Sequence, residues 1–545
     1  MENNKLNSFP FYRWMPRPLG ILILMLLFVP PTFSGGAYLG NQNEMSGTLA
    51  LMAEDIQLAS FFTSIGMCLF VPFMIRFLQT RSVRRTYLWC FGLLVPLNYI
   101  CAVTTSLPVL LAACLLTGLV RVAAMLNCTF TIAPYLTGVN TLSMFTLAET
   151  PAPETQYRME RTRTFLMPVL YCFILLIAQT SNIVTAWFAY RYNWQDAYYV
   201  TLGMLLAAVL LVLLTMPDIR NNEKYHIEWN KIPEMISMTV ALCCMAYILV
   251  FGKSLDWFDS RQITVATAVL LLSAGIFVLS ASSNGDRAYL PLDVFRYRNT
   301  WISMALFVTA MVFNSANSFA AAFLRISTST DSYHCTLLSW WATAGCLAGL
   351  ALSIILVVKK VRFRSIFVIA LLFMAFSNCL MYFQYQTAGM FENMILPTVL
   401  NFVGLLMLYS LVAAFGMKGL PARYLATFVF LMIWMRNSIA PVIGASVYSN
   451  WLNERQQYHI SVLSENVTPT DPAAAYTRSQ NVFIAKASGK SPCESEQFAA
   501  ITMKGKVMLQ ATIVAMKEIT GDTVVLILIA AGITFILPYR RGETT

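Results

Sequence analysis

Long apolar stretches alternate with short polar segments along almost the whole sequence. A helix needs about 20 mainly apolar residues to cross a hydrocarbon core about 30 Å thick. Fourteen stretches meet this requirement, so the pattern predicts an all-α polytopic membrane protein with fourteen transmembrane helices. The stretches lie at about residues 18–40, 57–78, 86–106, 108–134, 164–189, 196–216, 232–252, 262–282, 300–323, 336–358, 364–384, 393–416, 424–449 and 523–539.

The lysines and arginines between these stretches predict the topology. If the N-terminus lies inside, twenty-four of them fall in inside segments and four, including Arg325, in short outside segments. Basic residues concentrate on the cytoplasmic side of membrane proteins, although long outer segments are exempt from this rule. We therefore expect an inner-membrane protein with both termini in the cytoplasm and a long periplasmic loop at 450–522.

Composition excludes other classes of protein. The chain is 58% hydrophobic and 12% charged, whereas soluble domains are about 25% charged. Its net charge of +11 is scattered between the apolar stretches, so it does not predict a nucleic-acid partner. The three histidines lie far apart in the sequence, which gives no basis for a metal, a cofactor or an enzymatic centre.

A weak internal repeat predicts the domain organisation. The basic segment at 76–85 follows the second stretch, and a similar segment at 359–364 follows the tenth. Two equivalent six-helix bundles with two inserted helices would place these segments at matching positions, as in transporters that work by alternating access. The predicted parts are an N-terminal bundle at 1–217, a linker with helices 7 and 8 at 218–290, and a C-terminal bundle at 291–545.

Two arginines are predicted near the middle of the membrane. Arg121 lies about thirteen residues into the fourth stretch and Arg436 about twelve into the thirteenth, at 1.5 Å rise per residue. An ionisable side chain at this depth costs at least about 2.5 to 3.5 kcal/mol, so it needs a reason to be there. Both are candidates for substrate or proton coupling, and the alternative is a structural bond to carbonyl groups of a neighbouring helix.

Acidic partners for these arginines are few. Glu54 and Asp55, at the outer start of the second stretch, are the best candidates for carrying a proton. The alternative is an acidic first turn that complements the helix dipole.

Uncharged polar residues also occur inside the apolar stretches. An amide in lipid must find a partner or face a wet cavity, so cavity lining and helix–helix bonding are both open for each of them. Trp434 is also a candidate, because its aromatic side chain could form part of an apolar wall of such a cavity. The candidate substrate-binding residues from this pattern are Asn127, Gln179, Asn182, Asn314, Asn317, Asn401 and Trp434.

Several segments resemble one known family. They are residues 252–258 (GKSLDWF), 291–299 (PLDVFRYRN), 420–423 (LPAR) and 467–472 (VTPTDP), together with Arg436 and Gly444. In these segments the chain resembles the EmrB/QacA branch of fourteen-helix drug:proton antiporters of the major facilitator superfamily. Ser34 occupies the place of the acidic residue usual in the family's first helix, and we count it among the candidate substrate-binding residues.

The resemblance implies proton-driven export of hydrophobic or amphipathic small molecules. It also implies a periplasmic adaptor and an outer-membrane channel as partners in a Gram-negative host. A proton-coupled solute symporter on the same fold is the first alternative. A membrane-embedded enzyme or scaffold is the second, and the absence of a catalytic constellation in the sequence argues against an enzyme.

Overall fold

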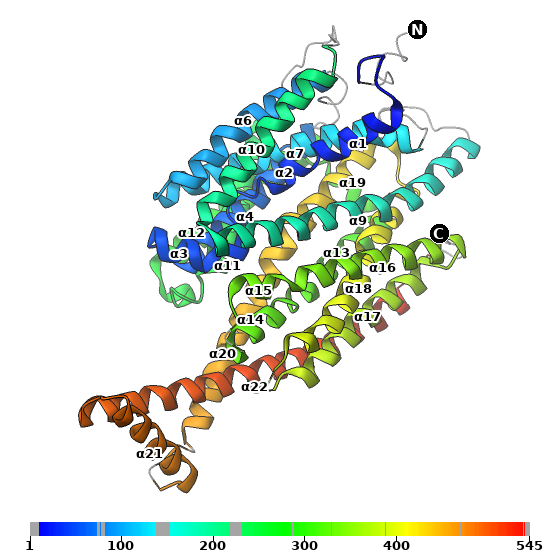
Figure 1. The fold of residues 1–545 in the computed structure, drawn as a ribbon. Coiled ribbons are helices and arrows are strands. Elements are labelled where there is room, and N and C mark those ends of the chain that lie inside the picture. The colour runs from blue at the N-terminus through cyan, green and yellow to red at the C-terminus, as the bar shows by residue number, and fades with distance from the viewer. Residues whose placement is uncertain are drawn as a thin grey trace.

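The structure is a computed structural model. It describes residues 10–73, 77, 82–137, 153–218, 231–285, 288–328, 330–386, 389–465, 467–468, 470–537 and 539. The elements in this part of the chain are helices (Figure 1). Some of the residues on which the predicted topology rests lie outside the described residues, namely Lys5, Arg76, Arg81, Arg220, Lys224, Arg287, Arg540 and Arg541.

The first half of the chain forms a group of helices that pack on one another through a buried apolar cluster. Its elements are α1 (Arg17–Leu27), α2 (Val29–Phe33), η2 (Leu39–Asn41), α3 (Gln42–Leu49), α4 (Ala53–Leu69), η3 (Val71–Phe73), α6 (Val83–Val103), α7 (Leu107–Thr137), α9 (Pro153–Arg191) and α10 (Trp194–Thr215). Pro30 and Pro31 cannot donate backbone hydrogen bonds, so they start a new short helix and divide the first predicted stretch at Phe28.

Two helices follow in the region predicted as a linker, and the second half of the chain comes after them. The linker helices are α11 (Ile232–Phe251) and α12 (Arg261–Asn284), with η5 (Trp257–Asp259) between them. The later elements are η7 (Leu292–Arg296), α13 (Arg298–Ser315), α14 (Ser318–Ser327), α15 (Ser332–Thr336), α16 (Leu338–Val358), α17 (Phe363–Gln384), η8 (Phe391–Met394), α18 (Ile395–Met417), α19 (Ala422–Trp434), the π-helix η9 (Met435–Ile439), α20 (Ala440–Glu465), α21 (Pro472–Ala487) and α22 (Pro492–Ile536).

Twelve helical segments in the described part of the chain are long and apolar enough to cross a membrane. They correspond to the third to fourteenth predicted stretches. The first two predicted stretches fall on the shorter helices α1 and α2, which together run from Arg17 to Phe33, and on α4, which has 17 residues. The protein is therefore a multi-pass membrane protein, and the number fourteen stays a prediction.

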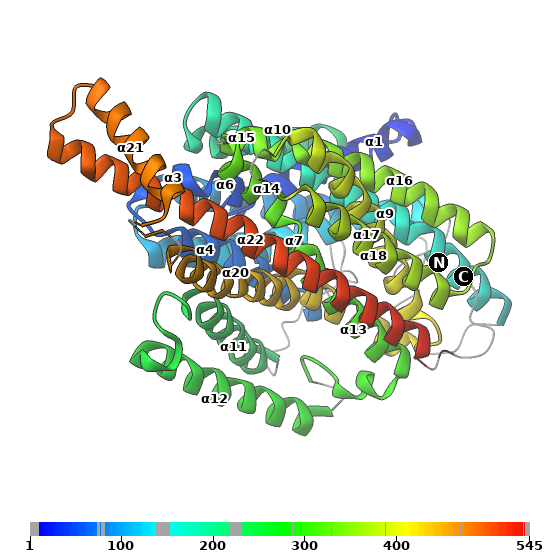
Figure 2. The same cartoon turned by 90° about the horizontal axis from the view of Figure 1, so that it is seen from below.

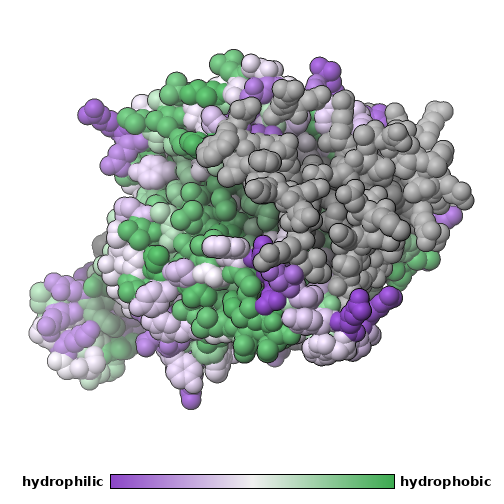
Figure 3. Space-filling view, turned by 90° about the horizontal axis from the view of Figure 1, so that it is seen from above, coloured by the Kyte–Doolittle hydropathy of each residue, from purple (hydrophilic) through white to green (hydrophobic). Residues whose placement is uncertain are grey.

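Burial differs strongly among these helices. In α18, 78% of the most apolar window is buried inside the protein, and in α12 only 17%. Helix α18 accordingly packs on α9, α13, α16 and α17, whereas α12 packs mainly on α11 at the edge of the bundle (Figure 2). Seen from above, hydrophobic residues cover much of the described surface, and hydrophilic residues gather mainly at its rim (Figure 3). The exposed apolar side chains are suited to lipid contact.

The segment predicted as a long periplasmic loop is largely helical. Helix α20 continues to Glu465, α21 follows, and α22 begins at Pro492. Figures 1 and 2 show α21 and the start of α22 projecting beyond the bundle. The start of α1 and the end of α22 lie at the opposite end of the bundle, which is the arrangement that an even number of crossings produces.

Local signals account for the helices in this projecting segment. Asp471 caps α21 by accepting a hydrogen bond from the Ala473 N–H, and Ser491 and Glu494 form a capping box at the start of α22. Further along, Arg455 and His459 of α20 contact Glu518 of α22 at 3.0 and 2.8 Å. These contacts join α20 to α22 next to the bundle.

Glycines allow α4 and α7 to pack at close range. A Cβ atom at Gly118 of α7 would overlap the carbonyl oxygen of Thr63, and one at Gly66 of α4 would overlap that of Leu115. Small residues at helix–helix contacts let backbones approach in membranes, where dispersion contacts drive association. The position of α4 against α7 therefore depends on these two glycines.

We predict that Gly118→Ile prevents this packing and destabilises the protein, because backbone atoms of α4 cannot move aside as a flexible side chain can. Gly203→Ile in α10 is the matched control, since a Cβ there meets nothing within 4 Å. Size-exclusion profiles and thermal unfolding of the detergent-extracted proteins are the measurements. A Gly118→Ile protein as monodisperse and heat-stable as Gly203→Ile would show that the contact is dispensable.

Candidate functional site

A cavity of about 400 Å³ lies between the two halves of the chain. We call it the central cavity. Helices α2, α4, α7 and α9 line it from the first half, and α14, α15, α16 and α18 line it from the second. Its polar lining residues are Thr32, Tyr38, Ser60, Thr63, Ser64, Arg121, Gln179, Ser181, Asn182, Asn317, Ser318, Arg325, Thr336, Ser339 and Thr398.

Arg121 reaches the central cavity from α7. Its Nη2 donates a hydrogen bond of 2.9 Å to the carbonyl oxygen of Thr32 at the end of α2. Its Nε is buried and has no hydrogen-bond partner. The hydrogen bond to the Thr32 carbonyl oxygen agrees with a structural role for Arg121. Its position in the cavity lining agrees with a role in substrate or proton coupling. Both interpretations therefore stay open.

Arg325 also lines the central cavity, from the last turn of α14. Its Nη2 donates to the Ser332 hydroxyl at 3.1 Å, and its Nε is buried without a partner. The sequence predicts this residue in an outer segment, because the ninth apolar stretch ends near residue 323. Helix α14 continues to Ser327, so Arg325 lies within the helix, and the polar residues Asn314 and Asn317 lie next to the break between α13 and α14.

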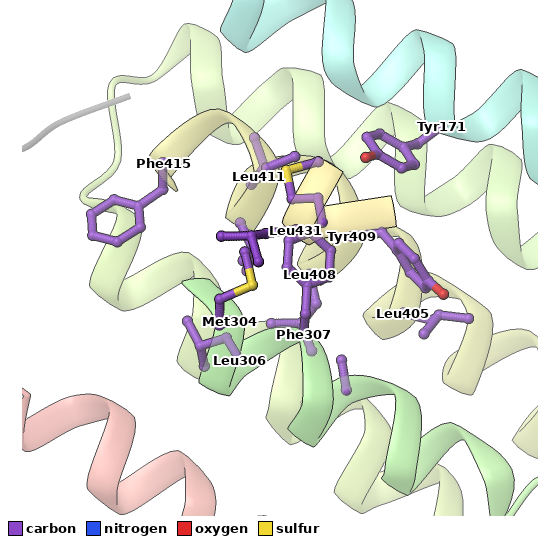
Figure 4. Packing of buried hydrophobic residues seen from close by; sticks show 14 of the residues in the cluster. Tyr171, Met304, Leu306, Phe307, Leu405, Leu408, Tyr409, Leu411, Phe415 and Leu431 are labelled. Carbon is purple, nitrogen blue, oxygen red and sulfur yellow. The ribbon is translucent and has the colours of Figure 1, made fainter. Parts of the chain in front are cut away.

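Arg436 lies outside the lining of the central cavity. It is in the π-helical turn η9, and its guanidinium stands over the rings of Tyr171 and Tyr409, 5.2 and 5.5 Å from their centroids. Figure 4 shows Tyr171 of α9 near Tyr409 of α18 at the margin of the buried apolar cluster. Cation–π contacts of this kind stabilise a charge that has few water contacts. Arg436 is close enough to Arg121 for the two charges to repel one another.

The π-helical turn also joins the two halves. The Ser438 hydroxyl donates to the Ser64 carbonyl oxygen of α4 at 3.0 Å and lies 3.0 Å from the Cys68 sulfur. A π-helical turn frees backbone groups and is frequent at functional sites. Because Ser64 lines the central cavity, a movement of η9 would be transmitted directly to its wall.

Of the predicted polar residues, the structure brings Gln179, Asn182 and Asn317 to the central cavity together with Arg121. The others lie outside its lining. Ser34 and Asn127 are fully buried: Ser34 accepts a hydrogen bond from the amide of Asn98, and the amide of Asn127 donates to the Val83 carbonyl.

The remaining amides and the tryptophan make contacts within the second half. Asn401 donates to the side chain of Asn314 at 2.9 Å, and the ring of Trp434 stacks on Phe430 with centroids 6.0 Å apart. These contacts join or support neighbouring helices. A substrate-binding role for Ser34, Asn127, Asn314, Asn401 and Trp434 stays a prediction.

Glu54 and Asp55 lie in the first turn of α4, outside the lining of the central cavity. Asp55 accepts a hydrogen bond of 2.9 Å from the Met52 N–H, which is a helix-capping contact. Their part in proton transfer stays a prediction. Helix α4 connects them to the cavity, because Ser60 lies only about 9 Å further along its axis at 1.5 Å per residue.

Contacts between the halves lie toward both ends of α4. Near its start, the Ser332 hydroxyl donates to the Gly40 carbonyl oxygen at 3.1 Å, and Tyr190 stacks on Tyr333. Near its end, the Ser438 hydroxyl of η9 lies 3.0 Å from the Cys68 sulfur of α4, and Tyr289 of the linker region donates its hydroxyl to the Leu69 carbonyl oxygen at 2.9 Å. The central cavity therefore has an inter-half contact on either side of it along α4.

A buried carboxylate that sequence reasoning missed holds Tyr289 in place. Glu234 of α11 is 1% exposed and accepts hydrogen bonds from the Tyr289 N–H at 2.7 Å, from the Ser280 hydroxyl and from the Asn284 amide. An acid at the start of an apolar stretch was the available signal. Buried charges with several hydrogen bonds lock local structure, so Glu234 fixes the contact between α11, α12 and the segment before η7.

Among the described residues, no group of three or more His, Cys, Asp or Glu side chains is placed to hold a metal ion.

The site yields a prediction about Arg436. Because the ring faces hold the guanidinium, Tyr409→Phe keeps the contact, whereas Tyr409→Leu removes it and lowers stability by about 0.5 to 2 kcal/mol. Thermal unfolding in detergent compares the two variants. Equal stability of Tyr409→Leu and Tyr409→Phe would show that the ring contributes nothing to holding Arg436.

Comparison with known proteins adds information on the family and the fold. The chain matches no model of a known protein family. It is similar to the multidrug export protein EmrB of Escherichia coli strain K12, with 23% identity over 300 residues that cover 53% of this chain and 56% of the relative. EmrB of Haemophilus influenzae is 20% identical over 292 residues, with the same coverage. The chain thus spans about half the length of the curated relatives it matches, and membership of the EmrB/QacA branch stays a prediction.

Solved structures match over almost the whole chain. A mutant of the peptide transporter POT has a TM-score of 0.53 at 14% identity and covers 97% of both chains. A crystal structure of tetrameric PepTSo2 has a TM-score of 0.51 at 14% identity and covers 94% of this chain and 97% of the other. The predicted fold class, an all-helical membrane protein with the major facilitator fold, is confirmed.

Proposed function

We propose that the protein is a secondary active transporter that exports amphipathic small molecules by alternating access. The observation that carries this proposal is the central cavity, which has many polar lining residues, lies between the two halves and has an inter-half contact on either side of it. If the halves rock about the cavity, one contact opens while the other stays closed. The similarity to EmrB supports a multidrug type of substrate and a place in the inner membrane.

Proton coupling is assigned to the two arginines and to the acids of α4. Arg121 and Arg436 lie close enough to repel one another, so a change of charge or position near one of them alters the energy of the other. Glu54 and Asp55 are partly exposed at the start of α4, where protons can reach them from water. Protonation there would act on the cavity through α4, which carries Ser60, Thr63 and Ser64.

The projecting helices are the proposed contact surface for a periplasmic adaptor, which would connect the protein to an outer-membrane channel. They expose large apolar side chains, among them Tyr476, Phe483 and Ile501, which are 64%, 73% and 70% exposed. If this segment lies in the periplasm, these side chains do not contact lipid. Exposed apolar patches of this kind mark interaction sites.

Transport is tested in everted membrane vesicles with a panel of fluorescent amphipathic compounds that are anionic, neutral or cationic. We expect at least one compound to accumulate inside when a proton gradient is present, and this accumulation to stop when a protonophore is added. Arg121→Gln should lower the initial rate about tenfold or more, since it removes a charged side chain from the cavity wall. Accumulation in the opposite direction, in right-side-out vesicles, would identify a symporter.

The proton-coupling assignment has its own test. The double variant Glu54→Gln/Asp55→Asn should transport at a rate that no longer responds to the proton gradient. Arg261→Gln is the control, because Arg261 is exposed at the start of α12, at the edge of the bundle. Wild-type gradient dependence in the double variant would remove both acids from the mechanism, and the absence of gradient-driven flux for the whole panel would overturn the proposed function.

A further inference from the structure

Two guanidinium groups, one from each half of the chain, line the central cavity. Arg121 comes from α7 and Arg325 from α14. The lining contains no aspartate or glutamate, and neither arginine makes an ion pair with a described residue. The hydrogen bonds of the two guanidinium groups to oxygen within the described chain go to the Thr32 carbonyl and the Ser332 hydroxyl, and Arg325 also contacts the side chain of Cys335.

Both arginines keep unused hydrogen-bonding capacity inside the protein. The Nε atom of each is buried and has no hydrogen-bond partner. A guanidinium offers five N–H donors in a planar fork that matches a carboxylate, sulfonate or phosphate. Leaving a buried donor unpaired costs about 1 to 3 kcal/mol, and more when the group is charged.

The electrostatics of the central cavity favour an anion. Arg436 adds a third positive charge close enough to act on Arg121. Like charges repel one another, and this repulsion is relieved when an anion enters. The amides of Gln179, Asn182 and Asn317 can donate further hydrogen bonds to an anionic group.

The same cavity has an apolar side that suits a carbon skeleton. Leu338, Ala342 and Phe402 of α16 and α18 line it opposite the first half. A volume of about 400 Å³ lies near the lower end of the range for small-molecule sites, which is about 300 to 1,000 Å³. The cavity therefore has room for one compact ligand with a charged end and an apolar end.

We propose that the central cavity takes a small organic anion whose carboxylate, sulfonate or phosphate group lies between Arg121 and Arg325. This inference rests on the proposed function and narrows its substrate class from amphipathic molecules in general to amphipathic anions. Because the two arginines belong to different halves, the anion bridges the halves and stabilises the state in which they are close. Arg325 is then a substrate-binding residue of the second half, matched to Arg121 of the first.

Binding to the purified full-length chain in nanodiscs tests the proposal. The probes share one ring system and differ in charge: naphthalene-2-sulfonate, 2-naphthalenemethanol and trimethyl(2-naphthylmethyl)ammonium. We expect calorimetry to show the sulfonate binding about tenfold or more tightly than the other two. Binding of all three probes with equal affinity would overturn the proposal.

Variants connect the affinity to the two arginines. Arg121→Gln and Arg325→Gln should each weaken sulfonate binding about tenfold or more, while Arg325→Lys keeps the charge and retains more of the affinity. Arg261→Gln should bind as the wild type does. Sulfonate affinity unchanged in Arg325→Gln, in a protein that elutes and unfolds as the wild type does, would overturn the proposal even if Arg121→Gln fails to fold.

The assay separates this inference from the proposed function, because binding is measured without a proton gradient. If the sulfonate binds through the two arginines but no compound is transported in proteoliposomes, the transport proposal fails and the anion site stands. If neutral or cationic compounds are transported while the sulfonate does not bind, the anion site fails and transport stands.

Discussion

A positive charge cannot remain in hydrocarbon without water, a counter-charge or a set of hydrogen-bond acceptors, and the interior of this protein is arranged around that constraint. Three arginines meet it in different ways. Arg121 uses a backbone carbonyl that the short helix α2 leaves available, Arg325 uses a serine hydroxyl, and Arg436 uses the faces of two tyrosine rings. The first two arginines still need a partner, and the cavity between them is where such a partner fits.

The helices can surround a polar cavity because the rest of the packing is close and apolar. Glycines bring α4 against α7 at backbone distance, and Gly345 does the same for α16 and α18, where a Cβ atom would lie 2.5 Å from the Val399 carbonyl oxygen. In each half, the glycine contact joins a helix that lines the cavity to its neighbour. Each half can then move as a unit, and such a motion would act on the contacts between the halves, which include the packing of α9 on α16 and α18 as well as the polar bonds.

The sequence predicted the fold class well, since the length and hydropathy of a stretch decide whether it can span a bilayer. It predicted the boundaries less well. The division of the first stretch before Pro30, the break between α13 and α14, and the π-helical turn at Arg436 all depend on how local backbone groups are satisfied by tertiary contacts. The helices of the projecting segment were not predicted, because only long apolar stretches were counted as helices and this segment is mostly polar.

The candidate site was predicted only in part, and for a physical reason. A polar residue in an apolar stretch must face either another helix or water, and periodicity cannot distinguish these when a helix is buried on most sides. Gln179, Asn182 and Asn317 face the cavity, whereas Asn401 bonds to Asn314. Arg325 was missed because the predicted stretch ends at residue 323, four residues before the end of α14, which moved Arg325 from the cavity lining to an outer segment.

Transport by alternating access requires that the two halves move against one another about the central cavity. Electron–electron distance measurements test it most directly, with genetically encoded spin labels at two exposed positions on either side of the α9–α15 contact, Tyr192 and Asp331. If the halves move, two distance populations should appear, and their ratio should shift when naphthalene-2-sulfonate is added or the pH is lowered. A single distance that neither change alters would contradict this movement.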